Sequence, residues 1–274
     1  WEALSTLSQA PYVADYLVTE VLAQQPDVVQ AFLLQTAILD VLAGDVCNAV
    51  TQRTDGHALL DTLYSRGLFV SAVNQRGLYR YHPLFADFLR DQLAQHPNYD
   101  PTALHRRAAR WYEQQGNMGQ AIHHALAAGD AETATRLVMA AARDYVLRGE
   151  FATLRRWFAK LPEANIQAHP KLSLFYAWVL VNAGPVSHAD DYLEALEADD
   201  DLGPALRGEM AVVRARAAVL HGDTEANLHF SKQALTLLPN DAALLRGDVA
   251  LGLAFAHSDR QDFDTARSYF EEAI

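Results

Sequence analysis

The chain has 274 residues, of which 50% are hydrophobic and 20% charged, and its formal net charge is −12. This composition describes a folded protein long enough for two domains. It argues against nucleic-acid binding, because affinity for a phosphate backbone comes from clusters of lysine and arginine. No apolar run approaches the roughly 20 residues that span a bilayer and no secretory signal opens the chain, so we expect a cytoplasmic protein without membrane contacts.

Several short helices are predicted in the first part of the chain. Residues 11–25 carry apolar side chains at helical spacing, and Asp27 is placed to cap the next helix, with Gln30 as its capping-box partner. Further helices are expected near residues 45–53 and 57–66.

Two β-rich runs, residues 68–73 and 78–82, then predict a hairpin. Pro83 suits the first turn of the helix that follows. Helices, a hairpin and a further helix in this order are typical of a winged-helix domain, which we place at residues 27–98. Residues 1–26 are then expected to form a linker helix from a preceding domain.

A winged helix raises the question of DNA binding. Residues 44–95 contain five arginines and five aspartates, so this region is neutral. The candidate recognition helix, residues 57–66, carries one arginine and one aspartate. A helix that reads DNA normally adds several arginine, lysine, asparagine or glutamine side chains. We therefore expect no direct contact between this domain and DNA.

The rest of the chain, residues 99–274, repeats a simple pattern: a glycine is followed five residues later by a small or apolar side chain. The copies are Gly116–Ala121, Gly129–Ala134, Gly149–Leu154 and Gly184–Ala189, with weaker ones at Gly222–Asn227 and Gln261–Ala266. From Gly149 onward their spacing is 35, 38 and 39 residues, close to the roughly 34-residue period of tetratricopeptide repeats. We expect a mostly α-helical solenoid of antiparallel helix pairs, with turns at the glycines and its last repeat cut short.

Several segments of the chain resemble one family of regulators. They are residues 32–39, 68–70, 79–85, 105–112 and 121–126. They are similar to the winged-helix region and following helices of MalT-type proteins, the large ATP-binding LuxR-family transcription regulators within the STAND class of signal-transduction ATPases. In that family an ATPase module precedes this region and a helix-turn-helix DNA-binding domain follows it.

The resemblance implies a regulatory and sensing segment that couples a nucleotide switch to the binding of a small-molecule inducer or a regulatory protein on the solenoid. ATP or ADP and the protein's own ATPase and DNA-binding domains are then expected only in the full-length protein. No glycine-rich phosphate loop occurs in this sequence, so we expect the chain itself not to be an enzyme. The alternative is a stand-alone tetratricopeptide adaptor that mediates protein–protein interactions.

The resemblance also assigns a role to His82, which precedes Pro83 at the start of a helix. In related STAND proteins a histidine at this place contacts the β-phosphate of bound ADP. Backbone donors and the positive end of the helix dipole favour an anion there. The alternative is a polar residue packed at the base of the hairpin.

Other candidate residues lie in the helical repeats. Trp157, Tyr176 and Trp178 are expected near the inner helices, where their rings either stack on a small molecule or pack in the core. His123 and His124 point about 100° apart on a helix and cannot chelate a metal together, so no metal site is expected. Seven carboxylates between Lys171 and Arg207 suit either a cation or a solvated helix connection.

Overall fold

The computed structural model describes residues 22–74 and 77–272. The expected linker helix lies outside the described residues up to residue 21. The chain divides into two compact units, Trp1–Thr133 and Ala134–Ile274, and each is described by itself.

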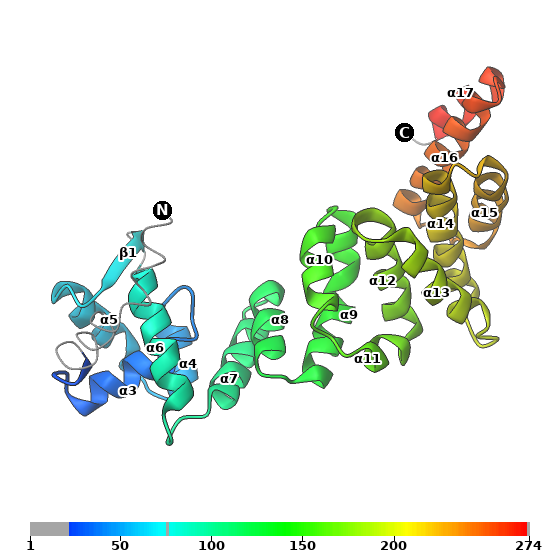
Figure 1. The fold of residues 1–274 in the computed structure, drawn as a ribbon. Coiled ribbons are helices and arrows are strands. Elements are labelled where there is room, and N and C mark those ends of the chain that lie inside the picture. Colours follow the sequence, from blue (N-terminus) through cyan, green and yellow to red (C-terminus); the bar gives the residue numbers. More distant parts are fainter. Residues whose placement is uncertain (1–21, 75–76, 273–274) are drawn as a thin grey trace. The chain divides into compact units, whose positions relative to one another are not determined.

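The first unit begins with the expected winged helix (Figure 1). Its elements are α3 (Asp27–Thr36), α4 (Gly44–Thr51), α5 (Gly56–Ser65), β1 (Val70–Asn74), β2 (Leu78–Tyr81) and α6 (Pro83–Gln95). The order of helices, hairpin and helix is confirmed. One detail differs: Asp27 is the first residue of α3 and not its cap, and the side chain of Gln30 donates to the carbonyl of Gln25 at 2.7 Å.

The hairpin is antiparallel, with Val70 opposite Tyr81. A third extended segment joins it, because Leu42 and Tyr79 exchange two backbone hydrogen bonds of 2.8 and 2.9 Å. The hydroxyl of Tyr81 is buried and hydrogen bonds to that of Thr36 at 2.7 Å, which fixes β2 against α3. The sequence pattern did not reveal the segment at Leu42, since a single bridge leaves no run of alternating residues.

Two more helices, α7 (Pro101–Gln114) and α8 (Met118–Ala127), complete the first unit. Leu104 and Ala108 of α7 belong to the same buried apolar cluster as the winged-helix core. Arg107 also donates from Nη1 to the carbonyl of Val50 at the end of α4, at 2.8 Å. The packing unit therefore extends beyond the domain boundary expected at residue 98.

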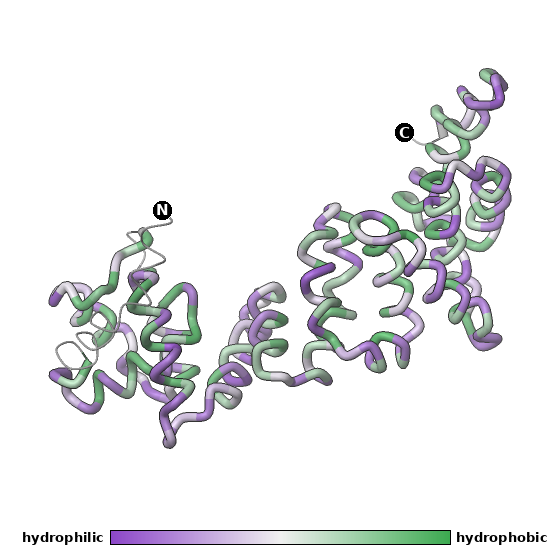
Figure 2. Tube along the Cα trace, in the orientation of Figure 1, coloured by the Kyte–Doolittle hydropathy of each residue, from purple (hydrophilic) through white to green (hydrophobic). Residues whose placement is uncertain are grey.

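The second unit is helical throughout its described residues and begins within α9 (Ala131–Leu147) (Figure 1). The helices that follow are α10 (Phe151–Phe158), α11 (Glu163–Gln167), α12 (Pro170–Ala183), α13 (Val186–Glu197), α14 (Pro204–His221), α15 (Thr224–Leu237), α16 (Ala243–Asp259) and α17 (Phe263–Glu272). Each of these helices carries both hydrophobic and hydrophilic residues, as expected for helices buried on one side (Figure 2).

The glycine pattern marks the turns between these helices. Gly116, Gly129, Gly149 and Gly222 adopt left-handed backbone angles, with φ between +63° and +73°. Gln261, at the turn between α16 and α17, adopts the same conformation at φ +63°. The small or apolar residue five positions later is buried in every copy: Ala121, Ala134, Leu154, Ala189, Asn227 and Ala266. Close approach of paired helices therefore accounts for the repeat.

Gly184 is the exception among the expected turns. Its φ is −141° and its ψ is −167°, which is extended backbone that any residue adopts. The next residue is Pro185, and a proline disfavours helical or turn angles in the residue before it. The chain still turns between α12 and α13 at this point, but without the left-handed step.

Candidate functional site

His82 caps the N-terminus of α6 and is exposed. Its backbone is held firmly, because its N–H donates to the carbonyl of Phe69 at 2.7 Å and its carbonyl accepts from Ala86 at 2.9 Å. Its imidazole has no hydrogen-bond or ion-pair partner among the described residues. A fixed backbone with an unengaged donor side chain, at the positive end of a helix, suits contact with an anion.

The carbonyl that holds His82 comes from a strained residue. Phe69 has φ +53°, an unusual value for a bulky side chain. Its ring packs against Phe85 of α6 with centroids 5.2 Å apart, and this packing helps to offset the backbone strain. The position of His82 is thus set from both sides, by the hairpin base and by α6.

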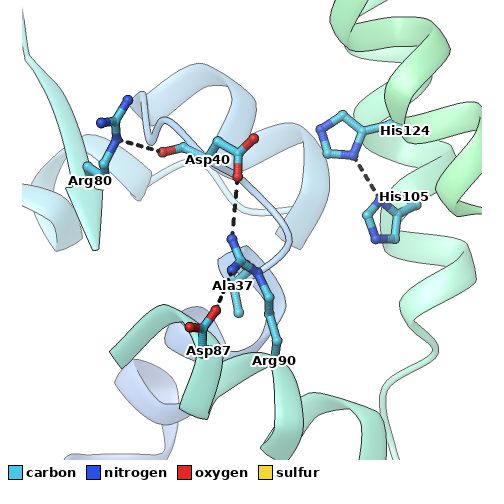
Figure 3. Close-up of polar contacts among 7 residues, drawn as sticks. All are labelled: Ala37, Asp40, Arg80, Asp87, Arg90, His105 and His124. Carbon is cyan, nitrogen blue, oxygen red and sulfur yellow. Dashed lines mark hydrogen bonds and ion pairs between the residues drawn. The ribbon is translucent and has the colours of Figure 1, made fainter. Parts of the chain in front are cut away.

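A polar network ties the hairpin and α6 to the loop after α3 (Figure 3). Arg80 of β2 donates to the carbonyl of Asp40 at 3.3 Å. Arg90 of α6 reaches the Asp40 carboxylate at 3.4 Å, the Ala37 carbonyl at 3.0 Å and Asp87 at 3.0 Å. Both arginines are therefore engaged in contacts within the domain.

A pair of histidines joins α7 to α8 (Figure 3). Nδ1 of His105 lies 2.8 Å from Nδ1 of His124, and the ring of His124 stacks on Tyr112 with centroids 5.4 Å apart. Burial lowers the pKa of His124 to about 3 and that of His105 to about 4. Both rings are thus neutral at pH 7, and the short contact requires one Nδ1 to donate and the other to accept.

His123 is not hydrogen bonded to this pair, but its ring meets that of His124 edge to face, with centroids 5.1 Å apart and 78° between the ring planes. Among the described residues no group of three histidine, cysteine or acidic side chains is arranged to hold a metal ion. A cavity of about 400 Å³ adjoins the pair and is bordered by Asp40, Arg90, His105 and His123. Asp40 and Arg90 already bond to each other across this wall, and His105 bonds to His124.

The three aromatic candidates of the helical repeats differ in access. Trp157 and Trp178 are each only 7% exposed, and Trp157 packs against Tyr145 with centroids 4.6 Å apart. Tyr176 is less buried and borders a cavity of about 450 Å³. Of the three, Tyr176 is therefore the residue with a surface available to a ligand.

The cavity beside Tyr176 is lined by residues of α10 to α13. Tyr176 stacks on Phe158 with centroids 4.7 Å apart and meets Tyr192 nearly at a right angle, at 5.0 Å and 80°. The hydroxyl of Tyr192 donates to Oε1 of Glu163 at 3.3 Å. Burial, together with the nearby Glu163 carboxylate, raises the pKa of Tyr192 to about 12.

Tyr192 and Glu163 were not singled out from the sequence. Tyr192 follows the buried Ala189 by three residues, so it lies on the same face of its helix. That spacing was a usable signal. Glu163 comes from the short α11, which the repeat pattern did not predict.

The carboxylates between Lys171 and Arg207 have separate roles. Asp190 and Glu197 form ion pairs with Arg214 at 3.0 and 2.9 Å, and so brace α13 against α14. Asp191 instead borders the cavity beside Tyr176. Asp191 and Asp199 both border its continuation, a smaller cavity of about 160 Å³. The acidic cluster is thus partly structural and partly a cavity wall.

No helix in the described part of the chain has the length and apolar character needed to cross a bilayer.

Comparisons with known proteins agree with this architecture. Residues 18–100 match the MalT winged helix domain family. The HTH-type transcriptional regulators MalT of Klebsiella pneumoniae and Cronobacter sakazakii are each 31% identical over 233 residues, covering 84% of this chain and 26% of theirs. The chain therefore spans about a quarter of the length of these relatives.

A solved structure shares the fold. It is a signal transduction ATPase with numerous domains (STAND) and a tetratricopeptide repeat sensor, from Pyrococcus horikoshii, with a TM-score of 0.56 and 15% identity. The match covers 94% of this chain and 40% of that one. That structure shows a shared fold, and the two MalT comparisons identify the chain as a MalT-like segment made of the winged helix and the helical repeats that follow it.

Proposed function

We propose that the chain is the regulatory and sensing segment of a signal-responsive, ATP-dependent transcription activator that acts in the cytoplasm. The winged helix takes part in a nucleotide switch, and the helical repeats bind a small-molecule inducer or a regulatory protein. The similarity to MalT over 84% of the chain supports this role. The chain itself is not catalytic in this proposal, because its sequence has no phosphate-binding loop.

His82 carries the nucleotide part of the proposal. The whole protein binds ATP or ADP mainly through its ATPase domain, and ADP brings a negatively charged phosphate to the switch. The exposed imidazole of His82, at the N-terminus of a 13-residue helix, has the donor chemistry to contact that phosphate. Such a contact stabilises the closed, inactive state more than the open one.

The test uses the full-length protein and calorimetry with ADP. Replacing His82 with Ala removes one charge-assisted hydrogen bond, worth roughly 1.5–3 kcal/mol, so ADP affinity falls about ten-fold or more. The matched control is His96→Ala, at the opposite end of the same helix. The proposal also requires the His82 variant to populate the active, oligomerising form more than wild type.

Equal ADP affinity in folded wild type and His82→Ala would remove His82 from the nucleotide site. In that case the residue is a polar group at the hairpin base. A lower melting temperature without a change in ADP affinity has the same meaning.

The second candidate function is a stand-alone tetratricopeptide adaptor. It is favoured by a groove between α14 and α16, where Val219, Leu251 and Phe255 are 48%, 39% and 56% exposed around a cavity of about 130 Å³. Exposed apolar side chains in a groove are typical of a protein-binding surface. The complete reading frame separates the two functions: a phosphate loop before this segment and a helix-turn-helix domain after it support the activator.

A further inference from the structure

The cavity between α10 and α13 has an unusual combination of walls. Its aromatic side consists of Phe158, Tyr176 and Tyr192. Its polar side is formed by Glu163, Asp191 and His188, and no described residue that lines it is a lysine or an arginine. Below we call this site, with its continuation toward Asp199, the tyrosine pocket.

The carboxylates of the tyrosine pocket lack positive partners. Glu163 accepts hydrogen bonds from Gln167 at 3.0 Å and Tyr192 at 3.3 Å, both on Oε1, and these fix its orientation. Neither Glu163 nor Asp191 forms an ion pair with a described residue, whereas the neighbouring Asp190 is paired with Arg214. Two negative groups therefore face the pocket without compensation, although an arginine close by compensates the next carboxylate along α13.

The rings of the pocket favour positive charge as well. The face of an aromatic ring is electronegative and attracts a cation within about 6 Å of its centre. Tyr176 and Tyr192 meet at 80°, so they form two sides of a corner. Burial and Glu163 raise the pKa of both tyrosines, so their hydroxyls stay protonated and the rings stay neutral at pH 7.

We propose that the tyrosine pocket binds an organic cation, a guanidinium or alkylammonium group held between the two tyrosine rings and the carboxylates of Glu163 and Asp191. Ionised carboxylates only accept hydrogen bonds, and these cations only donate them. A cavity of about 450 Å³ is within the size range of small-ligand sites. A metal ion does not fit, because no described group of three suitable ligand side chains surrounds the pocket.

This inference deepens the proposed sensing role, since it names a ligand class for the helical repeats. Its chemistry rests on the pocket alone. Binding is measured on the 274-residue chain without nucleotide, so a failure here leaves the ADP test of His82 unaffected.

The direct test compares two ligands of nearly equal shape, N-acetyl-arginine amide and N-acetyl-citrulline amide, by calorimetry. Only the first carries a positive charge. We expect the arginine ligand to bind at least ten-fold more tightly, and more weakly as salt is raised. Equal affinity of the two ligands overturns the proposal. So does a failure of both the arginine ligand and tetramethylammonium to bind with a Kd of about 10 mM or tighter.

Variants locate the binding. Glu163→Gln and Asp191→Asn remove charge with little change in shape, and each should weaken the arginine ligand about ten-fold. Tyr176→Leu removes a ring and should weaken tetramethylammonium as well. The matched control is Glu194→Gln, an exposed carboxylate on the same helix that does not line the pocket, and it should leave affinity unchanged. Unchanged affinity in both Glu163→Gln and Asp191→Asn, with the fold intact by circular dichroism, also overturns the proposal.

A third ligand identifies the source of the cation. The tripeptide Gly-Arg-Gly, blocked at both ends, presents the same guanidinium from a polypeptide. Binding as tight as that of the arginine amide assigns the pocket to an arginine side chain of a protein partner. Exclusion of the tripeptide, with the arginine amide still bound, assigns it to a free small molecule.

Discussion

Nδ1 of His124 lies 2.8 Å from Nδ1 of His105, and the His124 side chain is only 1% exposed. The contact joins two helices through a pair of neutral rings, so a second proton on the accepting ring would place two donors face to face. His123 and Arg90, which lie near the pair, oppose that proton further. The first repeat helices therefore depend on the neutral state of both histidines.

The first prediction is that this part of the protein loses stability in mild acid. Both pKa values are lowered in the folded state, to about 4 and about 3, from 6.5 in a free histidine. The stabilisation is complete above pH 6.5 and is lost as pH falls below it, because only the unfolded state then takes up protons. The free energy of unfolding should fall by up to about 1.4 kcal/mol per pH unit for the proton that His124 takes up only in the unfolded state.

Hydrogen exchange of α7 and α8 measures this effect. The free energy of opening is compared at pH 7.5 and pH 5.5, after the exchange rates are corrected for the intrinsic rate at each pH, and a change of about 1.4 kcal/mol corresponds to a roughly tenfold change in protection. We expect His124→Gln to lower protection at the higher pH and to flatten its pH dependence. The exposed His57→Gln serves as control and should follow wild type. A pH dependence that survives in His124→Gln and in His105→Gln would contradict the explanation.

The second prediction concerns Gln261, which adopts φ +63° where the other left-handed repeat turns have glycine. A side chain in this conformation costs about 1–2 kcal/mol, and glycine removes that cost. Part of the resulting stabilisation is offset, because glycine has greater conformational freedom in the unfolded chain. Gln261→Gly should therefore raise the free energy of unfolding by about 0.5–1 kcal/mol. Urea denaturation provides the measurement.

The reverse change tests the same argument at Gly222. A Cβ there meets no atom within 4 Å, so Gly222→Ala is expected to be destabilising through its φ of +72° alone. The loss should be about 1 kcal/mol. If both substitutions left stability unchanged, the left-handed turns would not be a source of strain.

The third prediction concerns the contact between α14 and the end of α15. A Cβ on Gly208 would lie 2.9 Å from the backbone nitrogen of Leu238, and backbone cannot move aside as a flexible side chain does. Gly208→Ala should thus destabilise the second unit by about 1–3 kcal/mol. Gly252→Ala is the control, because its Cβ would make only an ordinary contact of 3.7 Å with Asn227 and a helix interior favours alanine.

The fourth prediction is that the chain neither hydrolyses ATP nor binds duplex DNA appreciably at physiological salt. The net charge of −12 opposes binding to phosphates, and the winged-helix arginines Arg53, Arg80 and Arg90 are engaged within the domain. A mobility-shift assay with random duplex checks the DNA part. Submicromolar binding with a steep salt dependence would refute the electrostatic argument.

The fold was largely predictable because it depends on local patterns. Helix starts such as Pro83 and left-handed turns such as Gly116 are determined by a few adjacent residues. Gly184 shows the limit of the glycine rule, although Pro185 beside it already indicated extended backbone. The bridge between Leu42 and Tyr79 was out of reach, since its two partners are distant in sequence and each contributes a single residue.

The sites were less predictable than the fold. His82 was found through the family resemblance, and its role stays a prediction. Tyr176 was found as an aromatic residue on a repeat helix, but Glu163 and Tyr192 join it only when α11 and α13 fold against α12. Apart from the helical spacing of Tyr192 behind Ala189, a pocket built from several helices leaves no spacing in the sequence that marks it.

The packing of α7 on α4 decides where this protein can be divided. A piece that ended at residue 98 would lose Leu104 and Ala108 from a shared apolar cluster, and the bond from Arg107 to Val50 with them. The surface left on α4 would be hydrophobic and exposed, which favours aggregation. A winged helix produced alone should therefore retain α7 and α8, and the first helix pair of the repeats serves as part of the domain that precedes it.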